Sequence, residues 1–534
     1  MTKPSQWKHR AASLALLLSL LPAALFAWRM RHFEHLGYFH DDGMYWVSAK
    51  ALATGQGYRI LSYPGTPFQT KYPPVLPLLL AGVWKLFPIF PENMPWAMAL
   101  IAVTLPAFLY VLMRLLRAWG CSHGIAIAAC AWTALNPYIV FSSVNIMPEL
   151  LVSLLLGGCV LAARRSLLRG THADAFVAGA LGGAAYLTKS SVLPLLAAAP
   201  VWYALQKRFK LLAWFLAPLF VAVVSWNIWS FRHLAASTDP VTIYYTSYIG
   251  DLLHDMRGVD WLIFSKRNFP TLLGSIGNLL VPGLVEIPLL SANFSRLVGI
   301  FAIAGAVRYV KTSGMGLYHW FAAGYLTQLL LWQYPPNERF LIPVAPVILL
   351  GAITELRHLL GMLRSVWGST DRGQRTAAAM IASLLALIML WAGVMVALGH
   401  WALLPAIASR SHEQSADNAR AFEWMRRNLP STARVLTCYD APVFLRTGLH
   451  AMRPRNFPKE FYRQDRKAVI RAFDELPSFA HRHGIRYALL TRSDFDTDSF
   501  VKETVDWNRL ASSPPYRLLF RAPLAAVYEI ESRP

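Results

Sequence analysis

Two adjacent carboxylates follow the first apolar segment of the chain, within the run His40-Asp41-Asp42-Gly43-Met44-Tyr45. A cation, Lys71, stands in the next polar stretch, directly before a further apolar segment. An ionised carboxylate beside hydrocarbon is costly, so a pair kept there indicates a functional site. The chemistry open to such residues is metal binding, phosphate binding by the lysine, or proton abstraction from an acceptor group.

The composition places these residues in a membrane protein. Of 534 residues, 55% are apolar and only 15% are charged, and the mean hydropathy is +0.37, which excludes an ordinary soluble domain. The formal charge of +22 lies largely in short clusters between apolar runs, so we interpret it as membrane topology and predict no nucleic-acid partner. The 4 cysteines offer neither a disulfide framework nor a zinc spacing.

About eleven apolar segments are long enough to cross a bilayer as helices. They are residues 11–28, 95–116, 124–142, 147–163, 174–189, 191–206, 211–230, 297–310, 316–333, 340–357 and 377–404. With a cytoplasmic amino terminus and an uncleaved first segment, the basic clusters between them all fall on the cytoplasmic side. We assign the stretch 271–290 to the outer surface, because a further span there would invert the predicted orientation of every later segment.

The predicted fold is therefore an α-helical polytopic membrane protein with a C-terminal extracytoplasmic α/β domain. Residues 1–404 form the predicted transmembrane catalytic domain, with outer loops 29–94 and 231–296 and a short outer turn at 334–339. Residues 405–534 form the predicted soluble domain. In it the patterns predict helices over 419–428 and 473–483 and strands over 434–438 and 486–490.

A helix at the membrane interface positions the acidic pair. Residues 42–54 fit such a helix, ended by Gly55 and Gly57, with Tyr45 and Trp46 on its apolar face. Asp41 then lies at its amino end. Two roles fit it there: an N-cap, whose side chain accepts a backbone N–H, and a general base at the bilayer surface.

Several motifs occur in an order that resembles a known superfamily. They are Asp41-Asp42-Gly43-x-Tyr45, Lys71-Tyr72-Pro73-Pro74-x-x-Pro77-Leu78, Asn136-Pro137 ahead of Met147-Pro148-Glu149, Gly179-x-x-x-Gly183-x-x-x-Leu187-Thr188-Lys189, and Glu338-Arg339-Phe340-Leu341-x-Pro343-x-x-Pro346. Over residues 10 to 400 the chain is similar to the GT-C membrane glycosyltransferases. The branch it resembles holds the dolichyl-phosphate-mannose protein mannosyltransferases and the bacterial aminoarabinose transferase that acts on lipid A.

The resemblance implies transfer of a sugar, with inversion, from a polyprenyl-phosphate carrier to a hydroxyl of a lipid, glycan or protein. The reaction would occur on the non-cytoplasmic face of a membrane, here a bacterial inner membrane. By matching position, Asp41 corresponds to the family's base, and Asp42 and Glu149 stand where the family has further acidic residues. The residues expected to bind the carrier phosphate or other parts of the substrates are Lys71, Tyr72, Lys189, Arg232, Arg339 and Tyr45.

Each cation also has a structural interpretation. Lys71 can anchor the headgroup region, Lys189 can be a snorkelling lysine at a helix end, and Arg232 can belong to an interfacial belt. Arg339 can pair with its neighbour Glu338.

The other candidates have such interpretations too. Glu149 can simply complement a helix dipole from the first turn. Tyr244, Tyr245 and Tyr248 can stack on a sugar or anchor the loop at the interface.

A metal is a weaker expectation. In the lipid A branch a Glu precedes the Lys-Pro-Pro and helps to hold a divalent cation, whereas here Thr70 precedes Lys71 and Tyr72 intervenes before Pro73. Asp41 and Asp42 could hold a hard cation, but two adjacent carboxylates alone make a weak site. No cofactor is therefore certain.

Three other classes remain as alternatives. A transporter would carry mid-span charges and repeated halves, a lipid-linked glycan polymerase or ligase would carry a large basic outer loop, and a scaffold would bind a partner through its terminal domain.

Overall fold

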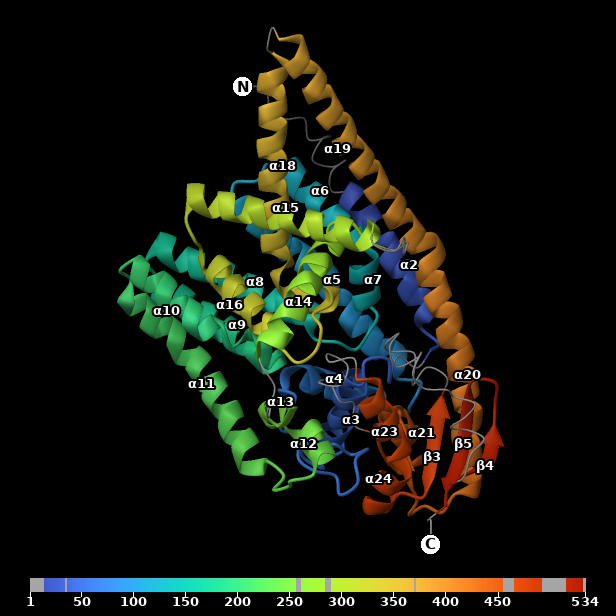
Figure 1. Ribbon diagram of the computed structural model, residues 1–534. Helices are drawn as coiled ribbons and strands as arrows, with labels where there is room; N and C mark the ends of the chain where they lie inside the picture. Colours follow the sequence, from blue (N-terminus) through green and yellow to red (C-terminus); the bar gives the residue numbers. More distant parts are fainter. Residues whose placement is uncertain are drawn as a thin grey trace.

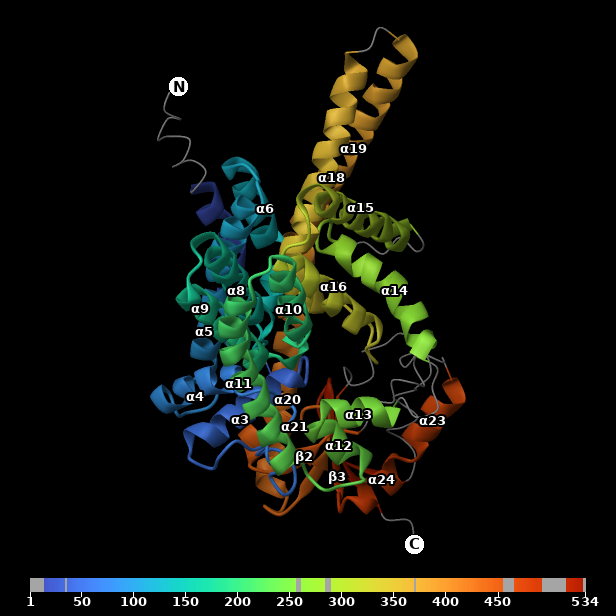
Figure 2. The same ribbon diagram turned by 90° about the vertical axis from the view of Figure 1, so that its left-hand side faces the viewer.

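The computed structural model describes residues 14–33, 36–255, 261–283, 290–368, 371–454, 465–491 and 515–531. Most of them are helical, and a small five-stranded sheet lies near the carboxyl terminus. Figure 1 shows this sheet at one end of the molecule, below the helices. The hairpin of α18 (Ala345–Trp367) and α19 (Arg372–Leu398) projects from the other end (Figure 2).

Five helical stretches are long and apolar enough to cross a membrane among the described residues. They are Met94–Ala118 (α5), Glu149–Arg169 (α8), Phe209–His233 (α11), Glu338–Trp367 and Arg372–Asn428. Shorter apolar helices are Leu14–Met30, which contains α2 (Leu21–Met30), Val75–Leu86 (α4), His123–Leu135 (α6) and Ser190–Leu205, which contains α10 (Leu195–Leu205). The membrane-type helical architecture is as expected, while the number of spans stays a prediction.

The remaining helices fill the body and the predicted outer loops. In the body lie α9 (His172–Thr188), α14 (Trp261–Asn278), α15 (Leu290–Ser313) and α16 (Leu317–Leu330). In the loops lie α3 (Asp41–Ala53), α12 (Pro240–Thr246) and α13 (Tyr248–Asp255). Helix α3 matches the predicted interface helix over 42–54.

The structure bears on three predicted segment boundaries. The segment 124–142 is split, because the side chain of Asn136 caps a separate short helix, α7 (Pro137–Ser142), that begins at a proline. Residues 271–278 belong to α14, which packs on α15 and α16, and the assignment of 271–290 to the outer surface stays a prediction.

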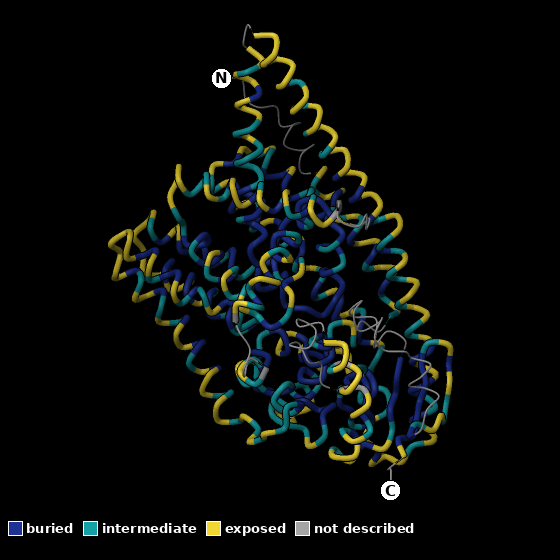
Figure 3. The backbone as a smooth tube through the Cα atoms, viewed as in Figure 1, coloured by how far each residue is buried: buried dark blue, intermediate teal, exposed yellow. Residues whose placement is uncertain are grey.

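The third boundary is the predicted domain boundary at 404, which stays a prediction. Helix α19 (Arg372–Leu398) continues through a π-helical turn at Gly399–Leu403 into α20 (Leu404–Asn428). The wider turn directly precedes Pro405, which has no backbone N–H to donate. One rod therefore runs from the projecting hairpin to the sheet, and much of its surface is exposed (Figures 1 and 3).

Glycines set the close packing of α9 on α11. A Cβ at Gly179 would overlap the carbonyl oxygen of Phe215, and one at Gly183 would lie 2.9 Å from the Cβ of Ala222. Small residues let two helix backbones approach closely inside a membrane. The Gly179-x-x-x-Gly183 motif thereby decides where Lys189, the C-cap of α9, leaves the helix.

The C-terminal sheet has the strand order β2-β1-β3-β5-β4. Its strands are β1 (Arg434–Leu436), β2 (His450–Met452), β3 (Tyr487–Thr491), β4 (Tyr516–Arg521) and β5 (Ala525–Ile530). Strand β1 pairs in parallel with β2 and β3, while β5 pairs antiparallel with β3 and β4. The sequence prediction finds β1 and β3 and misses the other three strands.

Helices flank this sheet: α21 (Asp440–Thr447), α23 (Arg466–Asp474) and α24 (Leu476–Arg482). The predicted helix over 473–483 falls on α24 and the last residues of α23. One apolar cluster includes Trp46 of α3, Leu76 of α4 and Leu436 and Ala441 of the C-terminal part. The two predicted domains therefore share a core at this end of the molecule.

Candidate functional site

Asp41 is the first residue of α3, and the N-cap position belongs to His40, which has φ 61°. The structure thus shows that Asp41 is not an N-cap, contrary to one of its two expected roles. Its Oδ1 accepts a hydrogen bond of 2.6 Å from the hydroxyl of Tyr72. Its side chain is 26% exposed, so the carboxylate is held on one side and reachable on another.

Asp42 points into its own loop. Its oxygens accept the backbone N–H groups of Gly37 at 2.9 Å, Phe39 at 3.0 Å and Gly43 at 2.5 Å, and the residue is 0% exposed. Burial raises the pKa of Asp42 to about 6, against the lowering effect of these amides. Asp42 therefore stabilises the backbone of the loop that carries Asp41.

The metal expectation does not fit this arrangement. The two acidic residues have separate protein partners, a phenol for Asp41 and three amides for Asp42. Among the described residues, no group of three or more His, Cys, Asp or Glu side chains is placed to hold a metal ion. We accordingly derive no chemical step through a cation.

Three charged side chains, Lys189, Glu149 and Arg339, form a connected row that ends at Asp41. Nζ of Lys189 lies 2.7 Å from Oε1 of Glu149, and Nε of Arg339 lies 3.6 Å from the same oxygen. Nη2 of Arg339 lies 3.9 Å from Oδ2 of Asp41. Glu149 is 1% exposed, so it acts between the two cations while Asp41 remains the more accessible carboxylate.

The row resolves two of the structural alternatives. Arg339 does not turn to Glu338, whose Oε1 accepts from Asn278 at 2.7 Å; it turns to Glu149 and Asp41 and lies over the rings of Phe39 and Phe340. Lys189 does not snorkel from a helix end, because it is paired with Glu149.

Lys71 lies on another side of Asp41, in a nest of tyrosines. Its ammonium donates to the carbonyl oxygen of Tyr244 at 2.6 Å and lies 4.0 Å and 5.0 Å from the ring centroids of Tyr244 and Tyr248. Burial lowers the pKa of Lys71, although Asp251 and Asp41 oppose this effect. Tyr244 and Tyr248 therefore line the lysine, a contact that neither of their expected roles includes.

Tyr45 and Tyr72 pack edge to face, with ring centroids 5.0 Å apart, and both are 2% exposed. Tyr72 also meets Tyr248 at 5.5 Å. The aromatic rings thus support the hydroxyl that holds Asp41.

The charge of Asp41 follows from these neighbours. Burial acts to raise the pKa of its carboxyl group, but Arg339, the hydrogen bond from Tyr72 and Lys71 outweigh burial. The pKa is therefore lowered below its ordinary value. Asp41 is ionised at neutral pH, as a proton acceptor must be.

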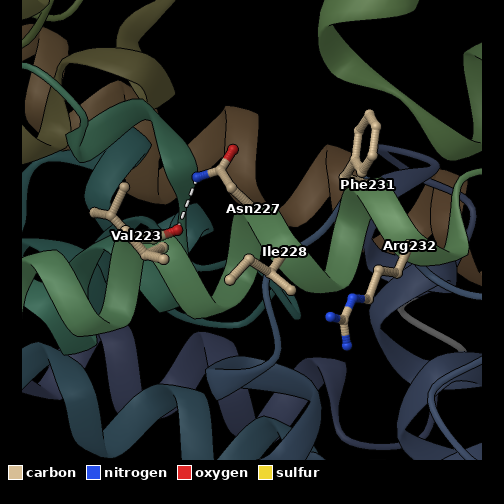
Figure 4. A pocket seen from close by; sticks show the side chains of 6 residues that line it. Val223, Asn227, Ile228, Phe231 and Arg232 are labelled. Carbon is tan, nitrogen blue, oxygen red and sulfur yellow. Dashed lines mark hydrogen bonds between the residues drawn. The ribbon is translucent and has the colours of Figure 1, made fainter.

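Arg232 lies apart from this row. It is exposed near the end of α11, beside an open depression of about 510 Å³ that is lined by Val223, Val224, Asn227, Ile228 and Phe231 of the same helix (Figure 4). Among the described residues, the contacts that build the row do not include Arg232. The structure brings the other predicted site residues together and leaves this one outside.

Sequence reasoning missed two buried neighbours of the acidic motif as site residues. His40 precedes Asp41 directly, and its Nε2 lies 3.4 Å from Oδ2 of Asp440, at the start of α21. The position of His40 beside the motif was an available signal. Asp440 follows almost four hundred residues later and carries no such signal.

Comparison of the sequence finds no matching protein-family model and no matching curated protein. Comparison of the structure does find relatives. The crystal structure of ArnT from Cupriavidus metallidurans bound to undecaprenyl phosphate is similar with a TM-score of 0.52 at 15% identity, over 99% of this chain and 98% of that one. The Archaeoglobus fulgidus oligosaccharyltransferase tethered to an acceptor peptide is similar with a TM-score of 0.51 at 12% identity, over 99% of this chain and 74% of that one.

This chain has the GT-C fold. The likeness spans the C-terminal sheet as well as the helices, whereas the sequence motifs ended near residue 400. Within this fold, α3, α8, α9 and α17 (Glu338–Leu341) carry or end beside the charged residues around Asp41.

Proposed function

We propose that this chain is an inverting glycosyltransferase that moves a sugar from a polyprenyl-phosphate carrier to a hydroxyl group. The observation that carries the proposal is the environment of Asp41: an ionised, partly exposed carboxylate, hydrogen-bonded by Tyr72 and 3.9 Å from the guanidinium of Arg339. The GT-C fold supports the class of reaction. A base beside a cation is what transfer from a lipid phosphate requires.

In the proposed step, the acceptor hydroxyl oxygen attacks the anomeric carbon from the face opposite the phosphate. Asp41 accepts the hydroxyl proton as the new C–O bond forms. The bond between the anomeric carbon and the phosphate oxygen breaks, and its electron pair stays on the phosphate. One displacement of this kind inverts the configuration of the sugar.

Positive charge for the departing phosphate comes from Arg339, Lys71 and Lys189. Nε of Arg339 is buried and has no hydrogen-bond partner among the described residues, so a phosphate oxygen would satisfy it. A planar guanidinium suits that bidentate contact. Glu149 holds Arg339 and Lys189 in place, Tyr72 and Tyr45 support the base, and we assign Arg232 no role in the transfer step.

The partners follow from this chemistry. The ArnT structure holds undecaprenyl phosphate, which supports a polyprenyl-phosphate donor here, and the acceptor is a hydroxyl of a lipid, a glycan or a protein. We place the enzyme in a bacterial inner membrane with its active face and C-terminal domain outside the cytoplasm. The basic clusters between the apolar segments support that orientation.

Sugar transfer in membranes tests the proposal. Membranes carrying the wild type, Asp41→Asn or Glu92→Gln receive a panel of radiolabelled undecaprenyl-phosphate pentoses and hexoses, and label is followed into lipid, glycan and protein. Glu92 is an exposed acid of the same predicted outer loop and controls for loss of charge. We expect transfer by the wild type and by Glu92→Gln, and none by Asp41→Asn at equal expression.

Two results would contradict the proposal. Equal transfer by Asp41→Asn would remove Asp41 as the base. No transfer by the wild type from any donor would argue against the transferase and favour the transporter.

A further inference from the structure

The C-terminal domain reaches the loop of Asp41 through three consecutive residues, Tyr439, Asp440 and Ala441. The ring of Tyr439 packs on Gly37, where an added Cβ would lie 2.8 Å from its Cδ1. The methyl group of Ala441 packs on Gly43, where an added Cβ would lie 2.6 Å away. The two glycines on either side of the acidic pair therefore leave room only for this segment of the C-terminal domain.

Asp440, between these two contacts, is 2% exposed. Its Oδ2 accepts a hydrogen bond of 2.8 Å from the hydroxyl of Tyr245 and lies 3.4 Å from Nε2 of His40. At the other edge of the imidazole ring, Nδ1 of His40 lies 3.1 Å from the hydroxyl of Tyr244. The imidazole thus lies between a carboxylate of the C-terminal part of the chain and a phenol of the outer loop.

The backbone of His40 needs such support. Its φ of 61° and ψ of −47° lie outside the regions that side chains other than glycine readily adopt. A residue in such a conformation persists only when its surroundings hold it there. The next residue is Asp41, so a change in the backbone of His40 moves Asp41 relative to Tyr72 and Arg339.

We propose that Asp440 is a positioning residue of the transferase. From the C-terminal domain it fixes His40 and thereby keeps Asp41 aligned with Tyr72 and Arg339. The inference rests on the proposed function and adds a task for the C-terminal domain, which the sequence left undefined. Asp440 touches neither substrate in this account; it acts through His40.

Kinetics of purified full-length enzyme test the inference, with the undecaprenyl-phosphate sugar that gives transfer in the membrane assay as the probe. Asp440→Ala should lower kcat about 10- to 100-fold, because misplacing a reacting group by about 1 Å costs rate. Its KM for the donor should change less than about twofold, because the loss lies in the transition state. Asp440→Asn retains an acceptor for Tyr245 and should lose less.

A second contact between the C-terminal domain and the outer loop provides the matched control. Nε2 of His483 lies 3.4 Å from Oδ1 of Asp239, at the start of α12. His483→Gln removes the imidazole from this contact without touching α3. We expect its kcat to match the wild type.

The possible outcomes distinguish failure of the positioning role from failure of the proposed function. A wild-type kcat for folded Asp440→Ala, or an equal loss for His483→Gln, would overturn the positioning role, since domain contact alone would then explain the data. If Asp440→Ala does not fold, Asp440→Asn and Tyr245→Phe are judged by the same kcat and KM criteria. Asp41→Asn is measured in parallel: full activity there means that the proposed function has failed, and not merely the role of Asp440.

Discussion

Lys189 and Glu149 form a buried ion pair, with 2.7 Å between Nζ and Oε1 and only 1% of Glu149 exposed. Arg339 approaches the same oxygen at 3.6 Å. One acidic side chain therefore compensates two cations. Glu149 is also the first residue of α8, so the expected complement to the helix dipole is present together with these ion pairs.

Removing the charge of Glu149 should destabilise the protein. Glu149→Gln leaves Lys189, which is 14% exposed, without its counter-charge; breaking a fully buried pair typically costs about 3 to 5 kcal/mol, so we expect a loss at or below the lower end of that range. The double variant Glu149→Gln with Lys189→Met should lose less than the two single variants together. Thermal unfolding in detergent measures this, and strictly additive losses would show that the pair is not coupled.

Removing the hydroxyl of Tyr72 should shift the pH profile. The hydrogen bond from Tyr72 helps to lower the pKa of Asp41, so Tyr72→Phe raises that pKa, and activity that needs ionised Asp41 declines at a higher pH. A hydrogen bond to a charged group is worth about 1.5 to 3 kcal/mol, so the acid limb of the kcat profile should move up by about 1 to 2 pH units.

The matched control is Tyr63→Phe, which removes a hydroxyl that bonds Thr242 in the outer loop. The acid limb of its kcat profile should lie at the same pH as that of the wild type. An unmoved acid limb in Tyr72→Phe would mean that the titrating group is not Asp41.

Asp42 should make stability depend on pH in an unusual direction. Its pKa in the folded protein, about 6, lies above its ordinary value of 3.8, so the folded state binds the proton more tightly than the unfolded state. Stability is therefore greatest below about pH 4 for this group and falls as pH rises toward 6. The difference corresponds to about 3 kcal/mol.

The comparison of wild type with Asp42→Asn isolates this effect. The variant has no titrating group at this position, so its melting temperature should vary less between pH 4 and pH 6 than that of the wild type. If the melting temperatures of the two proteins change equally between pH 4 and pH 6, Asp42 is not responsible.

The packing of α9 on α11 should not tolerate a larger residue at Gly179. Gly179→Ala places a methyl group against the carbonyl of Phe215, and overpacking of this kind costs about 1 to 3 kcal/mol. Gly393→Ala in α19 meets nothing within 4 Å and should leave the melting temperature unchanged or slightly raised. Equal melting temperatures for the two variants would contradict the close packing.

The local part of the site could be predicted from the sequence. Asp41 at the start of a helix over 42–54, with Lys71 near by in the chain, follows from local patterns, and α3 forms where expected. The split at Asn136 and the continuous rod through residue 404 were not predicted, because a cap or a π-helical turn depends on which neighbours the backbone meets.

The partnerships between the charges required tertiary structure. Glu149 and Lys189 are 40 residues apart, Arg339 meets Met147 across 192 residues, and Asp440 approaches His40 from the C-terminal part of the chain. Local periodicity carries no information about such pairs, because their geometry depends on how helices pack.

The sequence by itself determined that the chain is a helical membrane protein with an acidic motif near its start. Its high apolar content indicates a membrane protein, and the order of its motifs indicates the GT-C resemblance. Only the tertiary structure decided that Asp41 is the accessible carboxylate and that Asp42 serves the loop. It also placed Arg232 outside the row of charges. The physical reason is that exposure, pKa and partners are set by burial among residues distant in the chain.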